Sequence, residues 1–172
     1  VSTYDLLHIA IYPYVGSEAA RAFLLALKAK GYQPQVLVTD LNQDYAAVIT
    51  AVFPQAEHHE CVFHALQAWH RQIREVYGKD YQEQHPEAVV LQERIDQIFR
   101  AKTKRTAQRR YNRVLALQDA YVAQTPAVVA IFASLERHWP KLVNAIESDR
   151  IPMTNNATEL LIRRFDQHYQ TF

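Results

Sequence analysis

The run Gln35-Val-Leu-Val-Thr-Asp40 constrains the fold more than any other stretch, because apolar and β-branched residues follow one another there. A short run of this kind, bounded by turn signals, is typical of a strand buried on both faces of a sheet. Asp40 closes the run and would lie at the carboxyl edge of the sheet, where α/β proteins bind ligands. An aspartate at a strand end also commonly caps the next turn, so Asp40 alone does not establish a site.

Apolar patterns on both sides of this run predict further strands and helices. We expect a strand over 6–14, a helix that has Ser17 as its N-cap and ends at Gly31, a helix over 44–53 and a strand over 57–63. The order strand–helix–strand–helix–strand predicts parallel pairing with right-handed crossovers. The first part of the chain, residues 1–64, is therefore expected to be an α/β core.

Residues 65–150 contain no strand pattern and predict a helical insertion. The expected helices, with breaks at Gly78, Pro86, Pro126 and Pro140, cover 65–77, 86–101, 104–124, 126–138 and 139–147. Residues 151–172 then predict one more helix, from Asn156 to Tyr169, which would return to the core. The expected fold class is α/β with a long all-helical insertion.

Composition limits the function only weakly. The net charge of +1 identifies no partner, so a nucleic-acid surface would have to come from local clustering. The single Cys61 excludes an intrachain disulfide and fits a reducing cytoplasm. No long apolar run or signal peptide is present, and we expect a soluble, cytoplasmic protein. Because Val1 is not a start methionine and the last helical pattern lacks a stop signal, we expect a piece of a longer protein.

One segment is strongly basic. Residues 102–113 contain six cations and no carboxylate, so their charge is not offset locally. A solvated helix face and a surface for DNA phosphates explain this segment about equally well. The cations are Lys102, Lys104, Arg105, Arg109, Arg110 and Arg113.

Two further segments contain residues that could bind a metal. Glu159 follows Asn156 by three positions, which fits a capping box, but a carboxylate in a first helical turn could also ligate a metal, with Arg163 and Arg164 close to phosphates. The histidines around Cys61 fall short of the paired ligands of a structural zinc site. We expect Cys61 to be a buried apolar residue and His64 to begin a helix.

Together these segments resemble the DDE transposases of bacterial insertion sequences, and most closely those related to the Mutator-like group. The resemblance covers nearly the whole chain and rests on the order and spacing of several short motifs. These are Val-Thr-Asp40 followed by Tyr45, the Phe53-Pro-Gln-Ala56 step, Cys61-x-x-His64, and Thr154-Asn-Asn-x-x-Glu159.

The resemblance implies a ribonuclease-H-like mixed sheet in which three carboxylates hold two Mg²⁺ or Mn²⁺ ions for attack on a phosphodiester. It implies that Asp40 is the second aspartate and Glu159 the glutamate, both as metal ligands, with His64 near the active site. Asn155 and Asn156 would shape the entry to the glutamate helix. The partners would be double-stranded transposon ends and target DNA, bound by the insertion, with a dimer or higher multimer expected.

This chain departs from the family at the first aspartate. Asp5 precedes its strand in a segment that resembles a turn between two later strands of the family. We therefore expect the first strand and its aspartate to be absent, and this piece alone not to cut or join DNA, whereas a complete protein would.

Two alternatives stay open. The first is a catalytically incomplete remnant of a transposase that acts only as a DNA-binding module. The second is a small-molecule or phosphoryl-accepting α/β domain that uses Asp40. The second predicts more acidic residues after the first strand and a late lysine, and neither is visible in the sequence.

Overall fold

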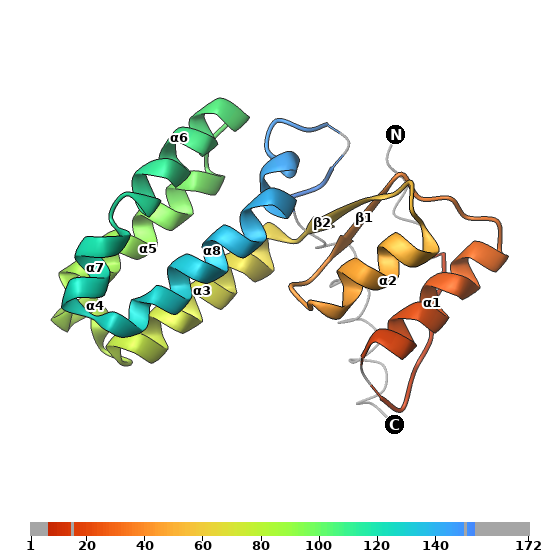
Figure 1. Ribbon diagram of the computed structural model, residues 1–172, viewed down its shortest axis with the longest axis horizontal. Helices are drawn as coiled ribbons and strands as arrows, with labels where there is room; N and C mark the ends of the chain where they lie inside the picture. Colours follow the sequence, from red (N-terminus) through yellow and green to blue (C-terminus); the bar gives the residue numbers. More distant parts are fainter. Residues whose placement is uncertain (1–6, 15, 150, 154–172) are drawn as a thin grey trace, which may run out of the picture. The chain divides into compact units, whose positions relative to one another are not determined.

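The computed structural model describes residues 7–14, 16–149 and 151–153, which fall into two compact units (Figure 1). The first unit covers the described residues up to His58, and the second covers residues 59–153. The predicted boundaries, after residues 64 and 150, lie within six residues of these. The first unit contains α1 (Ser17–Ala29), β1 (Val36–Thr39) and α2 (Asp44–Val52), and β2 (Glu57–Glu60) runs across the boundary.

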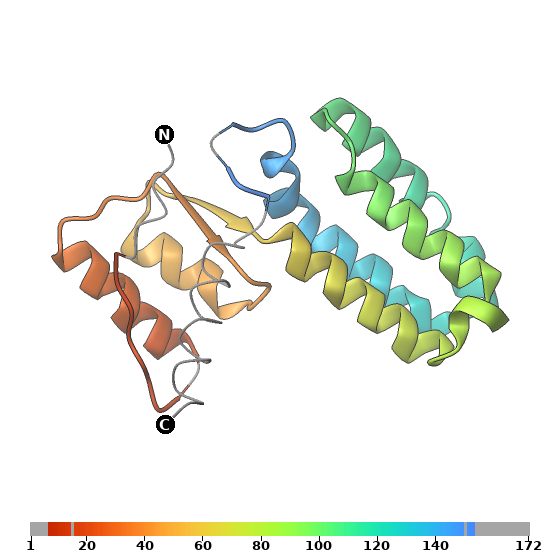
Figure 2. The same cartoon turned by 180° about the vertical axis from the view of Figure 1, so that it is seen from behind.

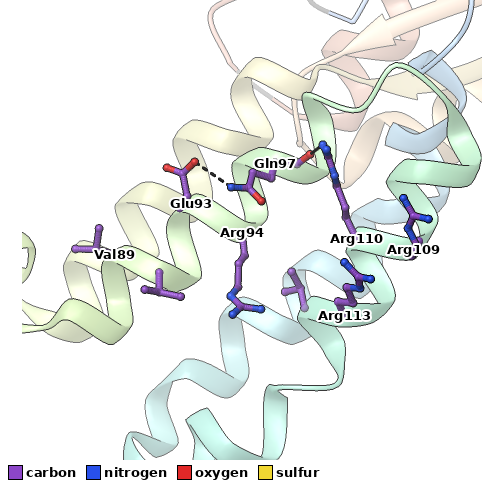
Figure 3. A pocket seen from close by; sticks show the side chains of 9 residues that line it. Val89, Glu93, Arg94, Gln97, Arg109, Arg110 and Arg113 are labelled. Atoms are coloured by element: carbon purple, nitrogen blue, oxygen red, sulfur yellow. Dashed lines mark hydrogen bonds between the residues drawn. The ribbon is translucent and has the colours of Figure 1, made fainter.

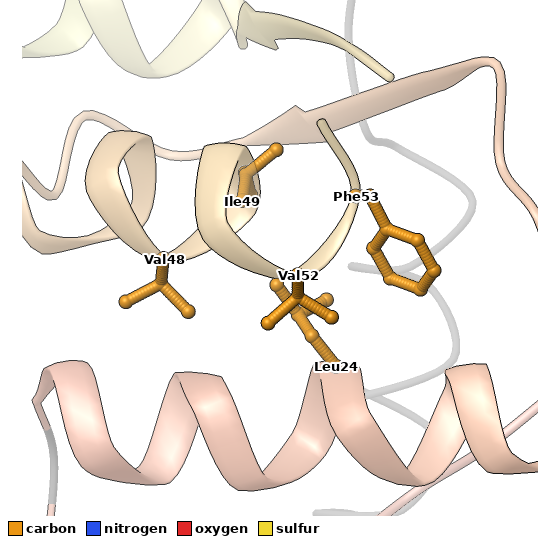
Figure 4. Packing of buried hydrophobic residues seen from close by; sticks show 5 residues of the cluster. All are labelled: Leu24, Val48, Ile49, Val52 and Phe53. Carbon is orange, nitrogen blue, oxygen red and sulfur yellow. The ribbon is translucent and has the colours of Figure 1, made fainter. Parts of the chain in front are cut away.

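Helices α1 and α2 pack against each other through a small apolar core. Leu24 of α1 belongs to one buried cluster with Val48, Ile49 and Val52 of α2 and with Phe53 directly after them, and Val48 and Val52 point toward α1 (Figure 4). Their spacing on α2 places one apolar stripe on one face of the helix, as the sequence predicts. The Lys28 ammonium donates a 2.8 Å hydrogen bond to the Val52 carbonyl, which places a cation at the negative end of α2.

The predicted helices of the first unit are confirmed, but the predicted N-cap is wrong. Gly16 is the N-cap residue of α1, and Ser17 is already its first helical residue. Gly16 has φ 151°, a backbone conformation that favours glycine over serine. Gly31, at φ 85°, follows the C-terminus of α1, and its amide bonds to the Lys28 carbonyl, as expected for a glycine that ends a helix.

Strands β1 and β2 form a parallel two-stranded sheet. The strand predicted around Asp40 is confirmed as β1, although its four residues are partly exposed rather than fully buried. The strand predicted over 6–14 is wrong for residues 7–14, which are neither helical nor extended in a sheet. Ile11 is 85% exposed there, and no described strand pairs with this segment. Apolar β-branched composition without a neighbouring strand does not make a strand.

The strand predicted over 57–63 is also too long. β2 ends at Glu60, Cys61 is the N-cap of the next helix, and Val62 is its first residue. The Val62 amide donates to the Met153 carbonyl at 2.9 Å, so it leaves the sheet ladder. Cys61 is fully buried, as expected. The helix expected to begin at His64 begins two residues earlier, so that His64 lies in its first turn.

After β2, all the helices and strands that the structure describes in the second unit are helices, as predicted. Its four longer helices form two adjacent pairs, α3 with α8 and α5 with α6 (Figure 2). These helices are α3 (Val62–Tyr77), α5 (Pro86–Phe99), α6 (Lys104–Leu115) and α8 (Val129–Leu142). The shorter elements are α4 (Tyr81–Gln84), α7 (Gln118–Gln124), η1 (Pro126–Val128) and η2 (Val143–Ala145).

Two details of the helical prediction are wrong. The segment 104–124 forms two helices, α6 and α7, rather than one. Pro140 does not break the helix, because α8 continues to Leu142. The ring of Pro140 is exposed in the last turn of α8, where its missing amide costs one hydrogen bond, while the flanking Trp139 and Leu142 are buried. Burial of these neighbours outweighs the intrinsic preference of proline.

A chain of aromatic rings joins the four long helices. The rings of Trp69 on α3 and Phe99 on α5 are stacked, with centroids 5.7 Å apart. The rings of Phe99 and of Trp139 on α8 meet edge-on, with centroids 6.2 Å apart. Tyr111 of α6 stacks on Trp139 with ring centroids 4.3 Å apart. The indole of Trp69 donates to Ser134 and that of Trp139 to Gln108, both at 3.1 Å, so both buried polar groups are paired. None of the helices described is long and apolar enough to cross a membrane.

Candidate functional site

Asp40 is exposed directly after β1, where its carboxylate also forms a local turn. One oxygen accepts a 3.0 Å hydrogen bond from the Asn42 amide, and the Asn42 side chain accepts a similar bond from the Asp44 amide. This is the capping arrangement expected of an aspartate without a functional role. The second oxygen accepts no hydrogen bond from the residues that the structure describes. Capping and ligand binding are therefore compatible at Asp40.

The surroundings of Asp40 are polar and partly charged. Thr39 donates to the Asp40 carbonyl at 2.8 Å, and its hydroxyl lies 2.9 Å from Nε2 of His58 on β2. Burial raises the pKa of the Tyr45 hydroxyl, and the negative charges of Asp40 and Asp44 raise it further. The Asp40 carboxylate thus acts electrostatically on the first turn of α2.

The predicted catalytic residues lie in different parts of the chain. Asp40 belongs to the first unit and His64 to the second. Glu159 lies outside the described residues, as do Asn155, Asn156, Arg163 and Arg164. Within the described ranges, no three His, Cys, Asp or Glu side chains are grouped to hold a metal ion. Asp40 is the one predicted metal ligand that the structure describes, and its carboxylate oxygens are donors that suit Mg²⁺.

A buried polar cluster that the sequence interpretation missed lies at the end of β2. Glu60 is 3% exposed, and its carboxylate accepts hydrogen bonds from His138 Nδ1 at 2.5 Å and Lys141 Nζ at 3.1 Å. His59 is fully buried, and its Nδ1 donates to the Lys141 carbonyl at 3.1 Å. Burial opposes ionisation of Glu60, but His138 and Lys141 outweigh it and hold the pKa of Glu60 below its usual range. The cluster fastens β2 to α8.

The basic segment forms α6 and the turn before it. Ala107, Tyr111 and Val114 are buried against the bundle, which directs the opposite face of the helix outward. Thr103 caps α6 by accepting from the Thr106 amide at 3.2 Å. Five of the six predicted cations are exposed, and Arg110 is partly buried. The segment is therefore a basic helix face, as both of its interpretations require.

A groove of about 660 Å³ runs between α5 and α6, and we call it the arginine groove (Figure 3). Arg94 of α5 stands on one side and Arg109, Arg110 and Arg113 of α6 on the other. The rest of its lining consists of Val89, Val90, Glu93, Gln97 and Val114. Arg94 was not predicted as a site residue, because it lies eight positions before the basic segment and next to Glu93.

Arg110 has a partner inside the fold. Its guanidinium donates to the carbonyl of Gln97, near the C-terminal end of α5. This bond links α6 to α5 and fixes one end of the arginine groove. Arg110 therefore has a structural task in addition to any contact with a ligand.

Comparison with known families agrees with the resemblance seen in the sequence. A search of curated proteins finds no match. The family model for "Transposase, Mutator family" matches residues 4–171, which is nearly the entire chain. A transposase acts on DNA, so DNA is the partner that this family implies. The chain belongs to the Mutator family of transposases.

Proposed function

We propose that this chain is the catalytic region of a DDE transposase, which cleaves DNA strands and transfers them in a metal-dependent reaction. The observation that carries the proposal is Asp40 at the carboxyl end of β1, a carboxylate with one oxygen that no described residue hydrogen-bonds, in a chain of the Mutator transposase family. Functional side chains of α/β sheets gather at such ends. The proposed core is ribonuclease-H-like.

In this proposal Asp40 and Glu159 are metal ligands and His64 lies near the reacting DNA. Two Mg²⁺ or Mn²⁺ ions, when bound, would polarise the phosphodiester and favour attack by water or a 3′ hydroxyl. Asp40 would contribute a hard oxygen ligand, and the hydrogen bond from the Asn42 amide to its other oxygen holds the carboxylate in place. The third carboxylate of the site is not assigned to a residue of this chain.

The second unit would contribute DNA contacts rather than chemistry. Its basic helix face has cations that can neutralise phosphates, and the predicted Arg163 and Arg164 would add to them. We further propose a cytoplasmic protein that works as a dimer or higher multimer on paired DNA ends.

The test is a nicking assay with the complete natural protein and DNA that carries the ends of its element. We expect nicking that requires Mg²⁺ or Mn²⁺ and falls at least a hundredfold in Asp40→Asn and in Glu159→Gln. Asp44→Asn is the matched control, because Asp44 lies in the same exposed turn and would not ligate the metal. Nicking that persists in Asp40→Asn, or that needs no divalent ion, would falsify the catalytic assignment.

The alternative is a transposase remnant that binds DNA without cutting it. The basic surface of the second unit favours this reading as much as the first. The same assay separates the two, because a remnant would bind the DNA ends and leave them intact with either metal.

A further inference from the structure

We propose that the arginine groove between α5 and α6 binds the sugar–phosphate backbone of DNA. Arg94 would contact the phosphates from the α5 side, and Arg109 and Arg113 would contact them from the α6 side. The inference rests on the proposed function, because it takes transposon or target DNA as the occupant. Binding in the groove differs from binding on a single basic face of α6, because the groove also includes α5 and Arg94, a residue outside the basic segment.

The charge of the groove is unbalanced. Four guanidiniums line it, against the single carboxylate of Glu93. Glu93 already accepts a hydrogen bond from Gln97 at 3.2 Å and lies 3.5 Å from Arg100, which is not part of the groove lining. None of the four groove arginines forms an ion pair with a carboxylate of the described residues. A polyanion is the complementary ligand.

Three of these arginines have their guanidiniums available. Arg94, Arg109 and Arg113 are exposed, whereas Arg110 is used to bind α6 to α5. Figure 3 shows Arg94 and Arg113 extending from the two helices that bound the groove. Guanidiniums on two facing helices can contact phosphates from both sides, which one helix face cannot.

The rest of the lining suits a backbone and not a base. Val89 and Val90 are 37% and 45% exposed, so they offer apolar contact to deoxyribose. No aromatic ring lines the groove, and the only amide, that of Gln97, is bonded to Glu93. Arginine contacts to phosphates and apolar contacts to sugars carry no sequence information, so a groove that binds the backbone in this way should bind all sequences alike.

The basic surface continues beyond the groove along α6. Arg105, Arg109 and Arg113 are four residues apart, so they form one stripe of roughly 12 Å on the helix. A second hollow lies along this stripe, and Arg109 and Arg113 border both hollows. A strand in the arginine groove would therefore meet further cations as it leaves.

The test measures binding of the complete chain to a random-sequence 30-bp duplex by fluorescence anisotropy, in EDTA and over a range of salt. Arg94→Gln should weaken binding roughly tenfold at about 0.1 M salt and lower the salt slope by about 1. Combining it with Arg109→Gln and Arg113→Gln should lower the slope by about 3. Circular dichroism verifies that each variant is folded.

The matched controls remove the same charge elsewhere in the second unit. Arg74→Gln on α3 and Arg137→Gln on α8 are exposed and outside the groove, and should leave affinity within about twofold. If Arg94→Gln bound DNA as tightly as wild type and only Arg105→Gln lost affinity, DNA would bind to one face of α6 alone. That result would overturn the proposal that DNA binds in the groove.

Two further outcomes also decide the matter. A loss confined to DNA with the element's ends would overturn backbone binding. A change of oligomeric state in Arg94→Gln, with unchanged DNA affinity, would assign the groove to a second copy of the chain. The binding assay contains no metal, so it tests the arginine groove independently of catalysis. Loss of nicking in Asp40→Asn neither supports nor weakens DNA binding in the groove. If the catalytic proposal fails, DNA binding in the groove can still be measured.

Discussion

The ring of Tyr111 lies parallel to that of Trp139, with centroids 4.3 Å apart and an angle of 8° between the planes. Tyr111 is the one aromatic residue of the basic segment and lies near its end. Its burial against α8 sets the rotation of α6, and the arginines at the neighbouring positions 109, 110 and 113 then fall on the outer face and in the groove. The packing core of the second unit thus determines where its positive charge is displayed.

This arrangement predicts a large effect of removing the Tyr111 ring. Tyr111→Ala should destabilise the second unit by about 3–5 kcal/mol, because it loses the stacked contact and leaves a cavity. Tyr111→Phe keeps the ring and should cost less than about 1.5 kcal/mol. Chemical denaturation followed by tryptophan fluorescence measures both. Equal stability of the two variants would contradict the role of the ring.

The N-terminus of α6 offers a second test. Thr103 accepts a hydrogen bond from the Thr106 amide, and Glu147 accepts one from the Lys104 amide at 3.0 Å. Thr103→Ala should lower the free energy of unfolding by about 1 kcal/mol, whereas Thr103→Ser retains the cap. Thermal melts of the three proteins at one pH give the comparison. A melt of Thr103→Ala that matches wild type would exclude this cap as a stabilising contact.

Because Glu60 is paired with His138 and Lys141, we expect the free energy of unfolding to fall at acidic pH. The pKa of Glu60 is lower in the folded than in the unfolded protein, so its contribution is complete above the unfolded value of about 4.3. It should decline as the pH falls below that value and through the folded pKa. Denaturant titrations at several acidic pH values should therefore show a steeper loss in wild type than in Glu60→Gln.

The control for this prediction is Glu83→Gln, because Glu83 is exposed in α4. Its acid dependence should match that of wild type. If Glu60→Gln lost stability with acid as steeply as wild type does, the low pKa of Glu60 would not contribute to folding.

The parts of the fold that follow from local patterns could be predicted from the sequence. The apolar run before Asp40 and the stripe on α2 depend on neighbours within a few residues, and both are confirmed. The helical character of residues 65–149 follows from composition and spacing in the same way. Glycine and proline indicate most of the helix ends correctly.

The remaining features depend on residues far apart in the chain. Glu60 is paired with His138 and Lys141, which lie 78 and 81 positions later in the chain. No local pattern connects Glu60 to these two residues. Arg94 becomes part of a basic groove only because α5 packs against α6. The strand predicted before Pro13 needed a sheet neighbour that its own sequence cannot supply. Tertiary packing decided each of these cases.

Tyr45 provides a measurement of the environment of Asp40 that does not depend on activity. Burial raises the pKa of Tyr45, and the charges of Asp40 and Asp44 raise it further. Asp40→Asn removes one negative charge, which lowers the free energy of the ionised form of Tyr45. The pKa of Tyr45 should therefore fall. Burial should still keep it above the ordinary value of about 10. NMR titration of ¹³C-labelled tyrosine resolves this residue among the ten.

Asp44→Asn should also lower the pKa of Tyr45, and Glu18→Gln on α1 serves as the control without effect, because Glu18 is exposed and its charge does not contribute to the raised pKa of Tyr45. An unchanged Tyr45 titration in Asp40→Asn would show that the carboxylate points away from α2. Such a result would remove the electrostatic link between Asp40 and the first turn of α2, because a charge close to the phenol cannot vanish without changing its proton affinity.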